Sequence, residues 1–243
     1  MSVPAVCAGC GGALKPSAAF CAACGRACVP AVVAPPAEGS LFHAIKLYVA
    51  LLVVQLLLMA YARLTKDAFT AEVGGTLLFA AAVLGFYLPV RRNLSSASRS
   101  FGLRWPWALA IAFGSVAIAL LVAGYVHGLA SLFGIHAPNE LAGLEDHPWP
   151  WSIALVVILP PLVEELAFRG VIYGGLRTSL SVGESLIVSS FAFAMIHMSI
   201  PTMLTHFPLG LYFGWLRHRS GSLWPGVLAH ACHNAVFIAI AWS

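Results

Sequence analysis

The chain has 243 residues, of which 60% are hydrophobic and only 9% are charged. Soluble proteins carry about 25% charged residues, so a chain this apolar cannot cover a soluble core with polar surface. Together with a mean hydropathy of +0.89, the composition indicates an all-α polytopic membrane protein. The formal charge of +4 is spread along the chain, which argues against a nucleic-acid-binding patch.

Two Cys-x-x-Cys pairs stand in residues 1–28. Both thiolates of such a turn can bind one ion, so two turns can complete a tetrahedral Cys₄ zinc site. Because no apolar signal segment precedes them, a reducing cytoplasm is expected, which disfavours the alternative of two disulfides. The segment resembles the short zinc ribbons at the ends of many prokaryotic membrane proteins. We therefore predict a structural Zn²⁺ bound by Cys7, Cys10, Cys21 and Cys24.

The rest of the chain divides into a linker and a helical bundle. Residues 29–40 are rich in proline and predict an extended linker. In residues 41–243, apolar segments recur at lengths that can cross about 30 Å of hydrocarbon, which predicts about seven transmembrane helices. The fourth should be kinked at Pro160-Pro161, where backbone N–H groups are missing. The predicted helices span residues 42–62, 73–90, 106–132, 151–176, 184–200, 203–218 and 222–242.

The basic residues indicate an orientation in the membrane. Arginines follow the second, fourth and sixth predicted helices, whereas residues 133–150 contain three acids and no Lys or Arg. The positive-inside rule then places the N-terminus and the arginine loops in the cytoplasm, although Arg63 and Lys66 oppose this. We expect a multi-pass protein of the inner (plasma) membrane with a cytoplasmic N-terminus.

Three polar motifs interrupt the apolar segments of the last third of the chain. A charged side chain at the bilayer centre costs about 2.5–3.5 kcal/mol, so two adjacent carboxylates there indicate a polar cavity. Buried polar groups must also find partners inside the bundle, which favours one cavity shared by all three motifs. The motifs are Glu164-Glu165…Arg169, Phe193…His197 and His230…Asn234.

These motifs, in this order, resemble those of the CAAX-protease and bacteriocin-processing (CPBP, or Abi) family of intramembrane endopeptidases. That family carries Glu-Glu-x-x-x-Arg, Phe-x-x-x-His and His-x-x-x-Asn/Asp, and the resemblance covers about residues 150–240. It implies hydrolysis of a peptide bond in a membrane-associated protein or peptide. Prenylated C-terminal peptides and bacteriocin leaders are substrate classes that it implies, and the fused zinc ribbon makes prenylated proteins the less expected of the two.

The residues also allow a mechanism to be written. Glu165 and Arg169 have the i, i+4 spacing of a helical ion pair with the acid first, so Arg169 should keep Glu165 ionised and oriented. Glu164 lies about 100° further round the helix and can face the cavity. We assign Glu164, together with His197, to activating the attacking water.

His230 and Asn234 would then donate hydrogen bonds to the oxyanion, a contribution of about 2.7–4 kcal/mol for each donor. A catalytic Zn²⁺ held by Glu164, His197 and His230 is the alternative, because these are the ligand types of catalytic zinc sites. The lack of a His-Glu-x-x-His motif, and the poor quality of Asn234 as a zinc ligand, favour the metal-free version.

Two non-enzymatic functions are also open: a proton-coupled transporter and a catalytically silent scaffold. The lack of a repeated half in the sequence disfavours a transporter, and the intact motif set disfavours a silent scaffold.

The partners we expect are membrane lipid, a membrane-associated substrate and a cytoplasmic partner for the ribbon, but no nucleic acid. Gly210 and Gly214 predict close helix packing. No role is assigned to Cys28, Cys232, His206 or His233.

The predicted ribbon has too few apolar residues for a core, so metal binding must supply its folding energy. A peptide of residues 1–40 is therefore expected to bind one Zn²⁺ through Cys7, Cys10, Cys21 and Cys24, and to unfold when a chelator removes it. Metal analysis and circular dichroism check this. A peptide that binds no zinc, or cysteines found as disulfides in the cell, would refute both the ribbon and the cytoplasmic N-terminus.

Overall fold

The structure is a computed structural model that describes Cys10, Gly12, residues 41–90, residues 105–135, Leu144 and residues 147–241. The chain divides into two units, Met1–Pro36 and Ala37–Ser243. The predicted linker and all but two residues of the predicted zinc ribbon lie outside the described residues, so the ribbon stays a prediction. All of the described helices belong to the second unit.

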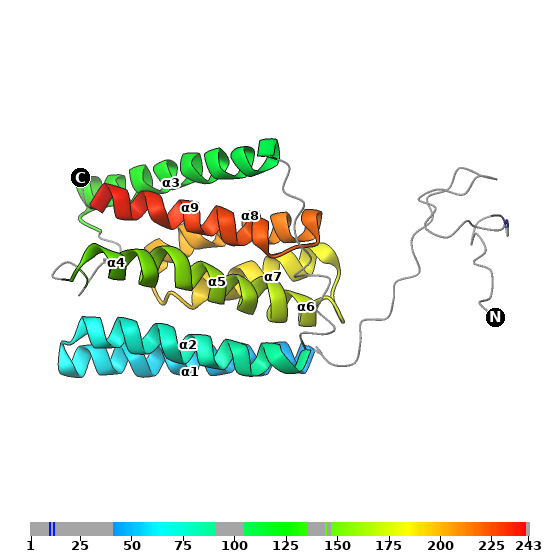
Figure 1. The fold of residues 1–243 in the computed structure, drawn as a ribbon, viewed down its shortest axis with the longest axis horizontal. Coiled ribbons are helices and arrows are strands. Elements are labelled where there is room, and N and C mark those ends of the chain that lie inside the picture. The colour runs from blue at the N-terminus through cyan, green and yellow to red at the C-terminus, as the bar shows by residue number, and fades with distance from the viewer. Residues whose placement is uncertain are drawn as a thin grey trace. The chain divides into compact units, whose positions relative to one another are not determined.

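Every secondary-structure element among the described residues of this unit is a helix, as predicted, and none of these residues forms a strand (Figure 1). Between Trp149 and Leu176, α-helical and π-helical (η) segments follow one another without a break. The elements are α1 Leu41–Thr65, α2 Ala68–Val90, α3 Trp105–Phe133, α4 Trp149–Ser152, η2 Ile153–Ile158, α5 Leu159–Glu165, η3 Leu166–Ile172, α6 Tyr173–Leu176, α7 Val182–Met195, α8 Ile200–Ser220 and α9 Trp224–Ala241.

Four helical stretches of the described chain are long and apolar enough to cross a membrane: Leu41–Thr65, Ala68–Val90, Trp107–Phe133 and Trp149–Leu176. Large apolar side chains on their outer faces, such as Leu121 at 75% exposed, fit a lipid environment. This supports a multi-pass membrane protein. The last three predicted helices are present as α7, α8 and α9, but α7 and α9 are shorter and α8 is less apolar. Their crossing of the membrane stays a prediction.

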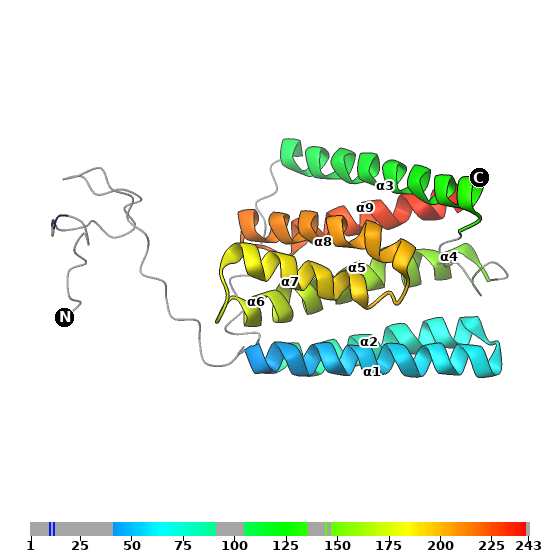
Figure 2. The same cartoon turned by 180° about the vertical axis from the view of Figure 1, so that it is seen from behind.

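The composite helix from α4 to α6 lies between two outer pairs of elements. The α1–α2 hairpin packs on one side of it, α3 and α9 lie together on the other, and α7 and α8 form a close pair (Figures 1 and 2). A Cβ atom on Gly210 of α8 would lie 2.9 Å from the Cβ of Ser190 in α7. The predicted use of Gly210 for close helix packing is thus confirmed.

The turn between α1 and α2 is shorter than predicted, because Asp67 caps the second helix. The backbone N–H of Thr70 donates to Asp67 Oδ1 at 2.9 Å, and hydrogen bonding to Thr70 lowers the pKa of this carboxyl. Helix α2 therefore begins at Ala68 rather than at residue 73. The earlier start makes Glu72 part of the helix.

The α7–α8 hairpin also differs from the sequence prediction, which continued the first of its helices to residue 200. In the structure α7 ends at Met195, Met198 takes a left-handed conformation with φ 51°, and α8 begins at Ile200 behind the cap residue Ser199. The hairpin turns part-way along the neighbouring α1–α2 hairpin (Figure 2). His197 therefore lies in a turn beside other helices and not within a helix.

Candidate active site

Glu165 and Arg169 form a buried ion pair, with side chains 0% and 1% exposed. Arg169 Nη1 lies 3.1 Å from Glu165 Oε1, and Arg169 Nη2 donates to the carbonyl oxygen of Gly210 at 3.1 Å. The guanidinium carbon also lies 4.4 Å from the ring centroid of Phe193 and 5.4 Å from that of Phe213. The predicted pair is present, and Arg169 ties η3 to both α7 and α8.

His230 of α9 connects this pair to the second carboxylate. Its Nδ1 lies 3.5 Å from Glu165 Oε1, and its Nε2 lies 3.8 Å from Glu164 Oε2. The imidazole stacks on Phe213 with ring centroids 4.9 Å apart. Each ring nitrogen thus faces a carboxylate oxygen slightly beyond hydrogen-bond length, so a small shift lets the ring donate to either carboxylate.

Gly226, near the start of α9, leaves the space that Glu165 occupies. A Cβ atom on Gly226 would lie only 2.7 Å from Glu165 Oε2. Any larger residue would displace the carboxylate or the start of the helix. The N-terminal end of a helix also carries partial positive charge, which favours a carboxylate beside it.

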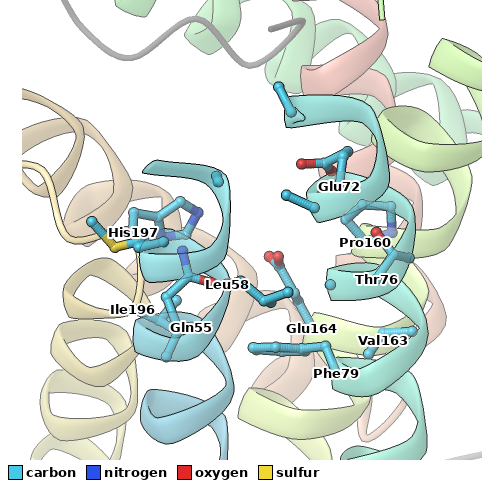
Figure 3. A pocket seen from close by; sticks show the side chains of 15 residues that line it. Gln55, Leu58, Glu72, Thr76, Phe79, Pro160, Val163, Glu164, Ile196 and His197 are labelled. Atoms are coloured by element: carbon cyan, nitrogen blue, oxygen red, sulfur yellow. The ribbon is translucent and has the colours of Figure 1, made fainter. Parts of the chain in front are cut away.

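Glu164 and His197 line one cavity with a volume of about 360 Å³. Its walls come from α1, α2, α5 and the turn after α7, and the carboxylates of Glu164 and Glu72 both point into it (Figure 3). Glu164 remains 18% exposed, in contrast to fully buried Glu165. Among the described residues, the polar ones that line the cavity are Gln55, Glu72, Thr76, Glu164 and His197.

The contribution of the α1–α2 hairpin to this cavity was not predicted from the sequence. Gln55, Glu72 and Thr76 were assigned no role, because they belong to no motif and lie far from the last third of the chain. One signal was present in the sequence: Glu72 is the only acidic residue in Leu41–Thr65 or Ala68–Val90. A lone carboxylate in an apolar helix indicates a polar cavity, as Glu164 does.

His197 is held by its own preceding turn of chain. Its Nδ1 donates to the carbonyl oxygen of Phe193 at 3.0 Å, which assigns the proton to Nδ1 and leaves Nε2 as an acceptor. His206 of α8, to which the sequence motifs gave no role, lies beside it with ring centroids 4.0 Å apart. The sequence offered no signal for this contact, because it depends on how α7 and α8 pack together.

Asn234 compensates for a missing backbone donor. The carbonyl of Val156 would accept from residue 160 in an α-helix and from residue 161 in a π-helix, and both are prolines without an N–H. Instead, Asn234 Nδ2 donates to the Val156 oxygen at 2.9 Å. The π-helical segment η2 directly precedes the prolines, and this side chain binds one of its carbonyls, while the predicted kink itself stays a prediction.

The expectation that His230 and Asn234 line the same cavity as Glu164 is not met, because neither residue lines it. His230 lies between Glu164 and Glu165 of the buried ion pair. The amide of Asn234 donates to the backbone of η2. The amide of Asn234 has a second N–H besides the one given to Val156. Its assignment to the oxyanion stays a prediction.

Within the described ranges, no group of three or more His, Cys, Asp or Glu side chains could hold a metal ion. The alternative set of zinc ligands, Glu164, His197 and His230, thus does not fit a metal centre there. The geometry of these three residues therefore gives no support to a catalytic metal. The ribbon cysteines other than Cys10 lie outside the described residues, so that zinc site is untested.

Comparison with known proteins relates this site to peptidases. Residues 146–236 match the family model of the Rce1-like type II CAAX prenyl endopeptidases. The chain is 29% identical over 143 residues to the "putative membrane peptidase YdiL" of Bacillus subtilis (strain 168), which covers 57% of each chain. It thus spans little more than half the length of this relative. No solved structure matches the chain. Both similarities support a membrane protease.

The Asn234–Val156 hydrogen bond leads to a test of stability. Asn234→Ala should leave the Val156 carbonyl without a donor and lower the free energy of unfolding by about 1–3 kcal/mol. Pro160→Ala restores a backbone N–H to that carbonyl, so Pro160→Ala/Asn234→Ala should recover much of the loss. Thermal unfolding of the four proteins in one detergent gives the coupling. Strictly additive effects would show that the Asn234 amide does not replace the backbone N–H that Pro160 lacks.

Proposed function

We propose that the protein is an intramembrane endopeptidase that hydrolyses a peptide bond in a membrane-associated protein or peptide. The observation that carries this proposal is that Glu164 and His197 line one cavity, directly in front of a buried ion pair. The two similarities to membrane peptidases support it. They also favour it over a transporter or a silent scaffold, for which the described residues supply no specific observation.

In the proposed reaction a water molecule binds between the Glu164 carboxylate and the Nε2 acceptor of His197. Glu164 accepts a proton from this water as its oxygen forms a bond to the scissile carbonyl carbon. We keep the sequence-based assignment of His230 and Asn234 as donors to the negative charge that develops on the carbonyl oxygen, which requires both side chains to turn from their present partners toward the cavity. The C–N bond then breaks, and the proton held by Glu164 passes to the leaving amine. The products are a carboxylic acid and an amine.

The ion pair is proposed to position rather than to react. Glu165 fixes the Nδ1 side of His230, while Arg169 neutralises Glu165 and anchors η3 to α8 through Gly210. Removing one member of a buried pair leaves the other charge uncompensated, at a cost of about 3–5 kcal/mol. Substitutions at Glu165 or Arg169 should therefore lower stability as well as activity.

The remaining elements of the proposal concern the environment of the enzyme. We place it in the cell membrane with a cytoplasmic N-terminus, where membrane lipid surrounds the bundle. A ribbon with structural Zn²⁺ would contact a cytoplasmic partner or the substrate. These statements rest on the loop charges and the cysteine spacing alone.

Glu164→Gln should abolish cleavage of a membrane-associated peptide, because an amide cannot accept the proton of the attacking water. A loss of about 10²–10⁴ in kcat is expected, with an unchanged melting temperature. The matched control is Glu184→Gln in the exposed capping box of α7, where glutamine can replace glutamate. Undiminished cleavage by the Glu164→Gln protein in reconstituted membranes would overturn the mechanism.

The metal-free reaction predicts that a chelator does not slow a protein of residues 41–243, which lacks the ribbon. Cleavage should be equal within about twofold before and after dialysis against a strong chelator, because no proposed step uses a metal. Rates and zinc content are measured together on the same samples. Inhibition that added Zn²⁺ reverses would instead identify Glu164, His197 and His230 as metal ligands.

A further inference from the structure

Two arginines lie at the end of the bundle that is opposite to the turn between α1 and α2. The end of α6, the start of α7 and the end of α8 lie together there (Figures 1 and 2). The hydroxyl of Tyr173 lies 3.4 Å from His218 Nδ1, and this contact joins α6 to α8. The positive charges of Arg177 and Arg217 both act on this hydroxyl, so the two guanidinium groups lie near it. We call Arg177 and Arg217 the basic cluster.

Arg217 has a hydrogen-bond donor that is not satisfied. Its Nε is buried and has no hydrogen-bond partner among the described residues. A buried donor of a charged group is costly when it finds no acceptor. The end of α8 is closed by other donors, since the Leu216 carbonyl accepts from the Ser220 hydroxyl and the Arg217 carbonyl accepts from the N–H of Gly221. Arg217 as a whole is only partly buried, so an acceptor from outside the chain can approach its guanidinium.

Arg177 is held in place beside this donor. Its Nη1 donates to the carbonyl oxygen of Leu180, which uses one of the five N–H donors of the guanidinium. The acid of the neighbouring helix start, Glu184, accepts from the backbone N–H of Ser181 at 2.8 Å and so caps its own helix. The basic cluster therefore offers two adjacent positive charges with N–H donors, a combination that suits an anion with several oxygen atoms.

The aromatic residues around the basic cluster indicate which anion is available there. Trp215 of α8 is 47% exposed, and Trp224 at the start of α9 is 51% exposed. The ring of Tyr212 stacks on that of Trp215, with centroids 6.5 Å apart. Exposed tryptophan and tyrosine side chains at the ends of membrane helices gather at the level of the lipid headgroups. The basic cluster thus lies at the depth of the phospholipid phosphates.

We propose that the basic cluster binds the phosphate of an anionic phospholipid, with Arg177 and Arg217 each donating to phosphate oxygens. A guanidinium presents its N–H groups as a rigid fork that matches two oxygens of a phosphate. Basic pockets between membrane helices on the cytoplasmic side are known to bind anionic headgroups, and the loop charges predict that this end of the bundle is cytoplasmic. A lipid bound in this way joins α6 to α8. The inference does not depend on the proposed peptidase function.

The test measures lipid binding by the full-length protein in a neutral detergent. Short-chain phosphatidylglycerol is the anionic probe, and phosphatidylcholine of the same chain length is the probe without net charge. A rise in melting temperature with lipid concentration gives an apparent Kd, which should be at least tenfold lower for phosphatidylglycerol. Arg217→Gln and Arg177→Gln should each raise the Kd for phosphatidylglycerol at least fivefold. The matched control is Arg63→Gln, which removes an exposed arginine from the last turn of α1 and should leave this Kd unchanged.

Two further measurements separate recognition from folding and lipid from free phosphate. Arg217→Lys keeps the charge without the fork and should retain part of the preference for phosphatidylglycerol, so it carries the test together with Arg177→Gln if Arg217→Gln does not fold. Inorganic phosphate should bind at least tenfold more weakly than phosphatidylglycerol, and equal affinity would overturn the assignment to a lipid. Equal binding of the two lipids, or equal binding of phosphatidylglycerol by the Arg63→Gln protein and both cluster variants, would overturn the site itself.

Discussion

The burial of one arginine beside one glutamate constrains much of this bundle. Taking both charges out of water is costly, so Arg169 must find partners on every side. It finds a carboxylate in Glu165, a carbonyl in Gly210 and the ring faces of Phe193 and Phe213. These partners belong to the composite helix, α7 and α8, so one guanidinium fixes the relative positions of three elements. Glu165 in turn requires Gly226, which brings the start of α9 to the same point.

Departures from regular helix structure gather around this pair. The π-helical segments η2 and η3 lie on either side of α5, and the left-handed residue Met198 lies directly after His197. Irregular backbone within an apolar bundle is tolerated where side chains or a cavity satisfy the freed polar groups. The side chain of Asn234 provides the hydrogen-bond donor for the carbonyl of Val156. Of these irregular segments, η3 contains Arg169 of the buried pair, and the turn at Met198 follows His197, which lines the cavity.

The cavity is lined by two parts of the chain that lie far apart in the sequence. The region from residue 146 to 236, which resembles peptidases, supplies the proposed base and its supporting groups. The α1–α2 hairpin supplies an opposing wall that carries its own carboxylate, Glu72. The contribution of this hairpin explains why motif spacing alone describes only part of the site.

The sequence by itself determined the helical class, the approximate helices, the Glu165–Arg169 pair and the neighbourhood of Glu164 and His197. Apolar segment length and i, i+4 spacing are local properties, so they can be read without a fold. The tertiary structure decided the rest: the early end of α7, the contact of His206 with His197, the hydrogen bond from Asn234 to Val156, and the role of α2 in the cavity wall. These depend on which helices become neighbours, and no local pattern contains that information because the contacts join residues far apart in the chain.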